Sequence, residues 1–240
     1  MQTEDWLIRT ELMLGEKNLK KLKHSHVLIA GLGGVGSYAA EMIARTGIGE
    51  MTIVDSDIVQ TSNINRQLIA LHSTVGKDKT VLTGERLKDI NPSLKLHMLK
   101  GYIKDEFITE VLDRNKYDYI VDAIDTLSPK IYLIFHGLKR NNRIVSSMGA
   151  GGKLDPTMVR VADISETHTC KFASDIRKRL RRLEIETGFK AVYSSEVVPK
   201  NAIIATEDKN KKSMVGTISY MPAVFGCVCA SVVVRDLIES

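Results

Sequence analysis

Hydrophobic positions along this chain alternate between short strand-like runs and longer segments with helical spacing. The strand-like runs cover 26–30, 50–55, 94–99, 119–122, 143–147, 159–164 and 190–195. The segments predicted to be helical cover 11–23, 34–46, 77–90, 106–112, 128–140, 171–182 and 222–238. Because strand and helix alternate as far as residue 147, the pattern predicts an α/β fold with a Rossmann-like, doubly wound, mostly parallel sheet.

The last apolar stretch, 214–234, predicts a helix that begins at Pro222. About a dozen apolar residues precede Arg235 in this helix, whereas a membrane span needs about 20. We therefore expect a buried or dimer-interface helix and no transmembrane segment, while association with a membrane surface stays open. The polar, acidic residues at 1–9 do not resemble a signal peptide.

Length and composition suit one globular domain. The 240 residues are 43% hydrophobic and 26% charged, and their net charge of +5 permits binding to nucleic acid without requiring it. The three cysteines include no Cys-x-x-Cys pair, which argues against a disulfide framework and favours a cytoplasmic location. The six histidines show no metal-ligand spacing, and His168 with Cys170 comes nearest to a ligand pair.

A glycine-rich turn joins the first strand to the next helix. Its glycines are Gly31, Gly33, Gly34 and Gly36. Glycine lets the backbone approach a ligand closely, and the first amides of a helix attract phosphate. Asp55 ends the second strand, where dinucleotide-binding domains carry a carboxylate for a ribose. The arrangement is typical of nucleotide binding, but it does not by itself identify the nucleotide.

Further polar residues follow the second strand. They are Asp57, Asn63, Arg66, Gln67 and Lys79. A nicotinamide cofactor does not need an arginine and a lysine beyond the pyrophosphate turn. A nucleoside triphosphate does, because its additional phosphates must be neutralised while a bond to phosphorus breaks. These residues therefore indicate a nucleoside triphosphate.

The order of these motifs resembles the ubiquitin-activating-type superfamily of ATP-dependent adenylyltransferases. The matching motifs are GxGGxG, DxD, SNxxRQ and VGxxK, followed by Asp122 and Asp125, and the resemblance extends from about Arg9 to the C-terminus. It implies a homodimer that uses ATP and Mg²⁺. It also implies that ATP is bound by the four glycines together with Asp55, Asp57, Asn63, Arg66, Gln67, Lys79, Asp122 and Asp125.

The resemblance implies catalytic roles for four residues. Arg66 and Lys79 are expected on the phosphates, Asp125 is expected to hold Mg²⁺, and Arg9 is expected to reach the ATP of the partner subunit. Three of the residues have a structural alternative. Arg9 would then be a surface cation, Asp57 a loop cap and Asp125 a helix N-cap.

The second half resembles the branch that acts on threonylcarbamoyladenosine in tRNA. The segments that carry this resemblance are 163–167, 171–182, 192–196 and 216–226. The chain lacks the two Cys-x-x-Cys zinc pairs common in the thiamine and molybdopterin branches, and it has Cys170-Lys171 where many members have Asp-Pro. The implied activity is ATP-dependent cyclisation of the modified adenosine at position 37 through an acyl-adenylate.

The same resemblance predicts one adenylating domain over 1–240. Its ATP-binding half is 1–157, and 158–240 is the substrate-facing and dimer-forming half. The basic helix in the second half is expected to contact tRNA phosphates, and the alternative is a face that meets only solvent. Its cations are Lys171, Arg177, Lys178, Arg179, Arg181 and Arg182.

Other functions stay open at this point. The chain could instead adenylate the C-terminal carboxylate of a small sulfur-carrier protein, or be a non-catalytic nucleotide-binding subunit or a nicotinamide dehydrogenase. Cys227 and Cys229 could carry sulfur, but paired cysteines in an apolar helix are usually inert packing residues. A sulfur-transfer protein is a further candidate partner that the sequence neither requires nor rules out.

Overall fold

Seven strands form one sheet at the centre of the computed structural model, which describes residues 4–104, 106–205 and 213–239. The strands are β1 (His26–Ala30), β2 (Glu50–Asp55), β3 (Lys95–Lys100), β4 (Tyr119–Asp122), β5 (Ile144–Ser147), β6 (Val159–Asp163) and β7 (Lys190–Ser194). Their order is β3-β2-β1-β4-β5-β7-β6. Six strands run parallel, and β6 runs antiparallel to β7. The predicted mostly parallel, doubly wound sheet is confirmed.

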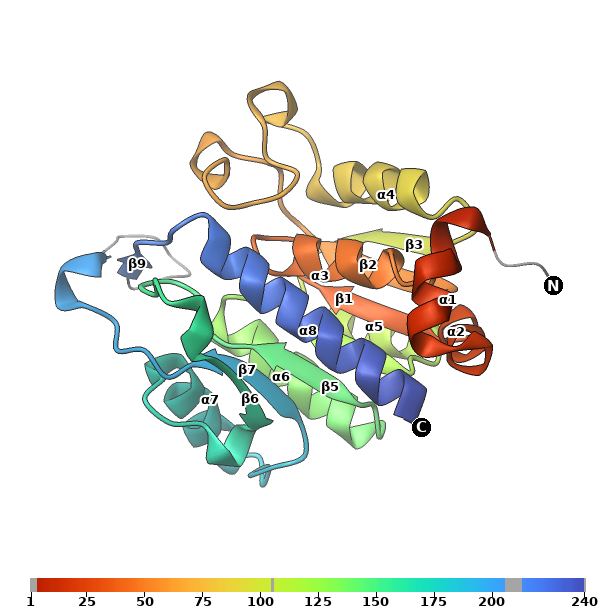
Figure 1. The fold of residues 1–240 in the computed structure, drawn as a ribbon. Helices are drawn as coiled ribbons and strands as arrows, with labels where there is room; N and C mark the ends of the chain where they lie inside the picture. The colour runs from red at the N-terminus through yellow and green to blue at the C-terminus, as the bar shows by residue number, and fades with distance from the viewer. Residues whose placement is uncertain (1–3, 105, 206–212, 240) are drawn as a thin grey trace.

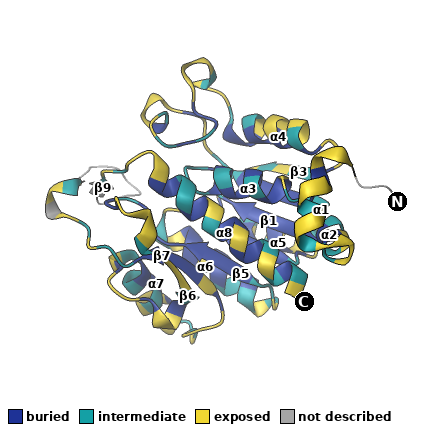
Figure 2. Ribbon diagram, in the orientation of Figure 1, coloured by how far each residue is buried: buried dark blue, intermediate teal, exposed yellow. Residues whose placement is uncertain are grey.

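Helices cover both faces of the sheet (Figure 1). One face carries α2 (Glu16–Lys23), α3 (Gly36–Ala44), α4 (Lys79–Ile90) and α8 (Tyr220–Glu239), and the other carries α5 (Glu106–Arg114), α6 (Leu127–Lys139) and α7 (Lys171–Arg181). The strands explain this arrangement, because alternate residues of β1 pack into the two opposite cores. Such strands are hydrophobic on both sides, and Figure 2 shows them buried between the helices.

The sheet reverses its strand order at β1, which pairs with β2 on one side and with β4 on the other. Ligands of doubly wound sheets bind beyond the carboxyl ends of the strands at such a switch point. The glycine turn follows β1, Asp55 ends β2 and Asp122 ends β4. The fold therefore brings the predicted nucleotide motifs to one edge of the sheet.

The C-terminal helix α8 is packed into the core on the same face as α3. It begins at Tyr220 rather than at the predicted Pro222, which lies within its first turn, where amides have no partner inside the helix. Within the described part of the chain, α8 is the one helix long and apolar enough to cross a membrane. Half of it is buried inside the protein, and Phe225 and Cys229 have no exposed surface.

Several elements differ from the sequence-based expectation. The single helix predicted over 11–23 is two helices, α1 (Ile8–Leu14) and α2, because Gly15 adopts a φ of +79° between them. A small hairpin of β8 (Ile203–Ala205) and β9 (Ser213–Val215) was not predicted. The charged residues at 206–212, between β8 and β9, lie outside the described residues. Short 3₁₀ turns occupy Asp5–Leu7, Thr61–Asn63, His72–Thr74, Pro156–Met158, Ile164–Glu166 and Lys200–Ala202.

Candidate nucleotide-binding site

The glycine turn after β1 is closely packed, and side chains would not fit at most of its positions. Gly31 has a φ of +90°, and a Cβ atom on Gly36 would lie 1.7 Å from the carbonyl oxygen of Gly31. A Cβ atom on Gly34 would lie 2.9 Å from the side chain of Pro222 in α8. Gly33 is more open, since its nearest neighbour would be Nε2 of Gln67 at 3.7 Å. The turn thus has the form of a phosphate cradle at the start of α3.

Asp55 is fixed against this turn by backbone hydrogen bonds. Its carboxylate accepts the amide of Leu32 at 2.6 Å and the amide of Asp57 at 2.8 Å. Burial raises the pKa of Asp55, while the charge of Lys79 and the two amides lower it less strongly. A carboxylate has about four lone-pair positions, so Asp55 retains acceptors for ribose hydroxyl groups.

Lys79 and Asp57 form an ion pair across the 56–78 loop. Lys79 is the first residue of α4 and is buried, and its Nζ donates to Oδ2 of Asp57 over 2.9 Å. The other carboxylate oxygen of Asp57 accepts the hydroxyl of Ser56 at 3.2 Å. Asp57 therefore has a contact within its own loop, to Ser56, as well as a charge partner, Lys79. Lys79 also lies close enough to Asp55 for its charge to lower the pKa of that carboxylate.

The loop between β2 and α4 carries two buried amide side chains, Asn63 and Gln67. Asn63 accepts the backbone amide of Gln60 at 3.1 Å and so stabilises its own 3₁₀ turn. Gln67 lies against Gly33, and its buried Oε1 has no hydrogen-bond partner among the described residues. A buried polar atom normally has a partner, so this oxygen fits a site that takes a polar ligand.

Arg66 lies on the same loop, turned toward its own backbone. Its Nη1 donates to the carbonyl oxygen of Ser62 and to Oδ1 of Asn65, both at 2.9 Å. Asn65 in turn donates to the carbonyl oxygen of Thr217 at 2.9 Å, just before α8. The loop is therefore joined to the C-terminal segment, and Arg66 has to rotate to meet a phosphate.

Asp122 differs from the expectation for a ligand-binding residue. It has no exposed surface, and its Oδ2 accepts Nζ of Lys130 at 2.6 Å and the hydroxyl of Ser146 at 2.6 Å. Its Oδ1 accepts the amide of Ile124 at 3.1 Å. Asp122 thus shapes the turn that carries Asp125 rather than facing the glycine turn. The sequence analysis did not identify Lys130, which is also fully buried.

Asp125 is exposed at the carboxyl edge of the sheet, between β4 and α6. The N-cap of α6 is Thr126, so the alternative of Asp125 as the N-cap is wrong. Mg²⁺ bound with a nucleotide typically takes one or two carboxylates and several phosphate and water oxygens. An exposed carboxylate at this edge fits that donor set.

Arg9 does not join these residues within one chain. It is exposed on α1, which Figure 1 shows in red at the end of the sheet where β1 begins, far from the loop at 56–78. Within one chain, Arg9 therefore lies apart from the nucleotide motifs. Only a second subunit would bring an Arg9 next to them.

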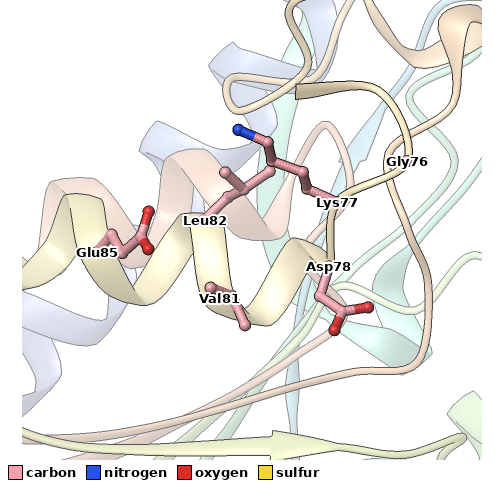
Figure 3. A pocket seen from close by; sticks show the side chains of 6 residues that line it. All are labelled: Gly76, Lys77, Asp78, Val81, Leu82 and Glu85. Atoms are coloured by element: carbon pink, nitrogen blue, oxygen red, sulfur yellow. The ribbon is translucent and has the colours of Figure 1, made fainter. Parts of the chain in front are cut away.

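A shallow hollow of about 340 Å³ lies beside the start of α4 (Figure 3). It is lined by Gly76, Lys77, Asp78, Val81, Leu82 and Glu85. These residues include most of the VGxxK motif but not the glycine turn. Of the two lysines in the VGxxK motif, Lys79 is the one that contacts the nucleotide motifs, through its hydrogen bond to Asp57.

The basic helix α7 presents most of its cations to solvent. Lys171, Lys178, Arg179, Arg181 and Arg182 are exposed. Arg177 is different, because its guanidinium group donates to the carbonyl and hydroxyl oxygens of Thr167. Arg179 lies 3.3 Å from the hydroxyl of Ser128 at the start of α6, so α7 borders the turn that carries Asp125.

The cysteines differ in accessibility. Cys229 is fully buried, and burial raises its pKa to about 12, so the thiol stays protonated at neutral pH. Cys227 is exposed, and partial burial of its thiol also raises its pKa. Neither environment activates a thiolate. His168 contacts the hydroxyl of Tyr193 at 3.1 Å, while Cys170 is buried.

Comparison with known proteins agrees with this geometry. A model of the ThiF family matches residues 7–239. A tRNA threonylcarbamoyladenosine dehydratase of Bacillus subtilis is 40% identical over 243 residues, covering 96% of this chain and 94% of that protein. The crystal structure of Escherichia coli tRNA N6-threonylcarbamoyladenosine dehydratase, TcdA, in complex with ATP has a TM-score of 0.89 at 30% identity, covering 100% of this chain and 98% of that one.

Another kind of relative matches over a shorter length. An adenylyltransferase and sulfurtransferase of Lodderomyces elongisporus is 30% identical over 151 residues, covering 63% of this chain and 33% of that protein. The family model and the Bacillus subtilis relative extend over nearly the whole sequence, including α7 and α8. This chain belongs to the ThiF family.

Proposed function

We propose that this chain is an ATP-dependent tRNA threonylcarbamoyladenosine dehydratase. The observation that carries the proposal is the extent of the similarity to proteins of that name. They match over both the nucleotide motifs and the second half, where α7 and the hairpin lie. The adenylyltransferase and sulfurtransferase matches over less of the chain, which favours tRNA over a carrier protein as the substrate.

The proposed ATP site uses the residues at the carboxyl edge of the sheet. The triphosphate lies on the glycine turn, Asp55 accepts the ribose hydroxyl groups, and Asn63 and Gln67 close the site from the loop. Lys79 and Arg66 neutralise the charge that grows on the phosphates as pyrophosphate leaves. Asp125 holds Mg²⁺, which when bound screens the phosphate oxygens.

The reaction that fits this site is a two-step dehydration. The carboxylate of the threonylcarbamoyl group attacks the α-phosphate of ATP, which forms an acyl-adenylate and releases pyrophosphate. The ureido group then attacks the activated carbonyl carbon and expels AMP, which closes a ring. No protein nucleophile is required, because the attacking group is held next to the carbonyl within the same nucleoside.

We further propose that α7 contacts tRNA and that the active form is a cytoplasmic homodimer. Four exposed cations on α7, with Arg182 directly after it, offer a phosphate-binding face, and Arg179 borders the turn of Asp125. On α1, Leu12 and Met13 are each 82% exposed, and a second subunit would cover them and receive Arg9. The chain is then one domain in which 1–157 binds ATP and 158–240 faces the substrate and the partner. A sulfur-transfer partner finds no activated thiol, because burial raises the pKa of both Cys227 and Cys229, although Cys227 is exposed.

The test is mass analysis of nucleosides from tRNA that carries threonylcarbamoyladenosine. The tRNA is incubated with the full chain, Mg²⁺ and ATP, and a matched reaction omits ATP. We expect the modified nucleoside to lose the mass of one water molecule only when ATP is present. An unchanged nucleoside, together with ATP–pyrophosphate exchange stimulated by a carrier protein ending in Gly-Gly, would replace this proposal with the carrier-activating function.

A further inference from the structure

Three side chains with metal-ligand atoms converge near the amino-terminal ends of three neighbouring strands. They are His26 at the start of β1, Glu50 at the start of β2 and His97 in β3. Across the ranges that the structure describes, this is the one group of at least three His, Cys, Asp or Glu residues whose ligand atoms all lie within 4.8 Å of one another. It lies at the opposite edge of the sheet from the glycine turn, so the proposed ATP chemistry does not use it.

The register of the parallel strands explains the convergence. His26 is paired with Glu50, and Thr52 is paired with His97, so these four side chains project from the same face of the sheet. Nδ1 of His26 lies 3.5 Å from Oε1 of Glu50, and Nε2 of His97 lies 2.7 Å from the same oxygen. A single carboxylate oxygen thus faces one nitrogen from each of two imidazoles.

These distances are close to those of a tetrahedral zinc site. Zinc binds nitrogen and oxygen at about 2.0–2.2 Å, which places neighbouring ligand atoms about 3.3–3.5 Å apart. The pair His26–Glu50 already has this spacing, and the pair His97–Glu50 has to open by about 0.6 Å. The side chain of His97 is 32% exposed, so it has room to move and leaves an open side for a water ligand.

Two neighbouring residues support and regulate such a site. The second ring nitrogen of His26 lies 2.8 Å from the hydroxyl of Thr52, which is the kind of outer contact that orients a ligating imidazole. Nζ of Lys95 lies 3.0 Å from Oε1 of Glu50, and its side chain is 66% exposed. The lysine can therefore leave for solvent when a cation takes its place.

We propose that His26, Glu50 and His97 bind a divalent transition-metal ion of the zinc class, which ties β1, β2 and β3 together. Imidazole suits zinc, cobalt and nickel, whereas Mg²⁺ takes oxygen ligands. The site therefore differs in metal preference from the ATP site at the other edge of the sheet. Lys95 is the internal competitor, because it neutralises Glu50 in the absence of the ion.

Cobalt titration of the metal-free full chain, without ATP, tests this proposal. We expect one Co²⁺ per chain with the visible absorption of a four-coordinate ion, and its displacement by Zn²⁺ but not by Mg²⁺. His97→Gln and Glu50→Gln should each weaken binding by at least tenfold, while His72→Gln, at an exposed histidine outside the cluster, should leave it unchanged.

Lys95→Gln provides a readout that a purely structural cluster would not give. Removal of the competing charge should tighten Co²⁺ binding several-fold, whereas loss of a supporting residue would weaken it. Zn²⁺ at a hundredfold excess over its Kd should also raise the Tm of the unaltered chain by roughly 5–10 °C, and not that of His97→Gln. Absence of four-coordinate absorption, or equal loss in His97→Gln and His72→Gln, would overturn the proposal.

Discussion

Nζ of Lys79 lies 2.9 Å from Oδ2 of Asp57, although Lys79 is 4% exposed and the side chain of Asp57 is 63% exposed. The cation is thus fixed inside the wall of the proposed ATP site, and its counter-ion stands in solvent. A phosphate that binds there meets a charge that is already in place. An exposed carboxylate in water is easily displaced from the pair, because surface ion pairs are weak.

Lys79→Ala should lower the rate of ATP-dependent dehydration by roughly 10²–10³-fold, as loss of one fixed electrostatic group does. Its stability should also fall, because Lys79 is buried and its charge offsets the burial of Asp55, so rates are compared below the Tm of every variant. The measurement is the rate of nucleoside conversion at saturating tRNA, with the Tm of each variant beside it. Lys77→Ala is the matched control, because this lysine is exposed and lies two residues away. Similar rates in the two variants would remove Lys79 from the mechanism.

Lys130→Met should destabilise the fold by about 3–5 kcal/mol, because it leaves Asp122 charged, buried and without its partner. The double variant Asp122→Asn, Lys130→Met should recover most of this loss, since no buried charge remains. Urea unfolding measures both, and Lys139→Met, an exposed position on the same helix, is the control. If the double variant is no more stable than Lys130→Met, the charge pair is not the cause.

Glu41 should make stability depend on pH. Burial raises the pKa of Glu41, but hydrogen bonds from Arg86 and Arg45 outweigh burial and hold the pKa below its ordinary value of 4.5. The stabilisation is therefore present above pH 4.5 and is lost as the pH falls through the lowered pKa. Glu41→Gln should cost about 1–3 kcal/mol at pH 7, and this difference from the unaltered chain should shrink in more acidic buffers. A difference that stays constant between pH 7 and pH 3 would contradict this account.

Arg9 is proposed to complete the ATP site of the partner subunit, and mixed dimers test this directly. Arg9→Ala and Lys79→Ala should each be inactive alone. Co-expressed in equal amounts, they form mixed dimers in which one site has both residues, so roughly a quarter of full activity should return. No recovery in verified mixed dimers would mean that Arg9 acts within its own chain, whereas an Arg9→Ala variant that is active alone would mean that Arg9 is only a surface cation.

The sequence predicted the sheet well because most of its strands are buried on both faces and are punctuated by glycine, or by proline after Asn91. It missed the helix break at Gly15, since the helical spacing of leucines continues across it. It also missed the buried partner of Asp122, because a lysine in a helix is normally solvated and Lys130 meets the strand only in three dimensions.

The sequence also did not predict the metal-ligand cluster at the amino-terminal ends of the strands. His26, Glu50 and His97 are far apart along the chain, and only the strand register makes them neighbours. Composition and spacing can identify a local turn such as the glycine motif. A site assembled from several strands can be identified only when it is known which residues of the strands are paired.

The close approach of Pro222 to Gly34 has a consequence for the order in which this protein matures during synthesis. A growing chain produces the glycine turn and α3 well before α8, so the side of α3 that packs against α8 stays uncovered until α8 has been made. The glycine turn gains its contact with Pro222 only at that stage. We therefore expect a chain that stops before α8 to leave both the glycine turn and an apolar side of α3 without their packing partner.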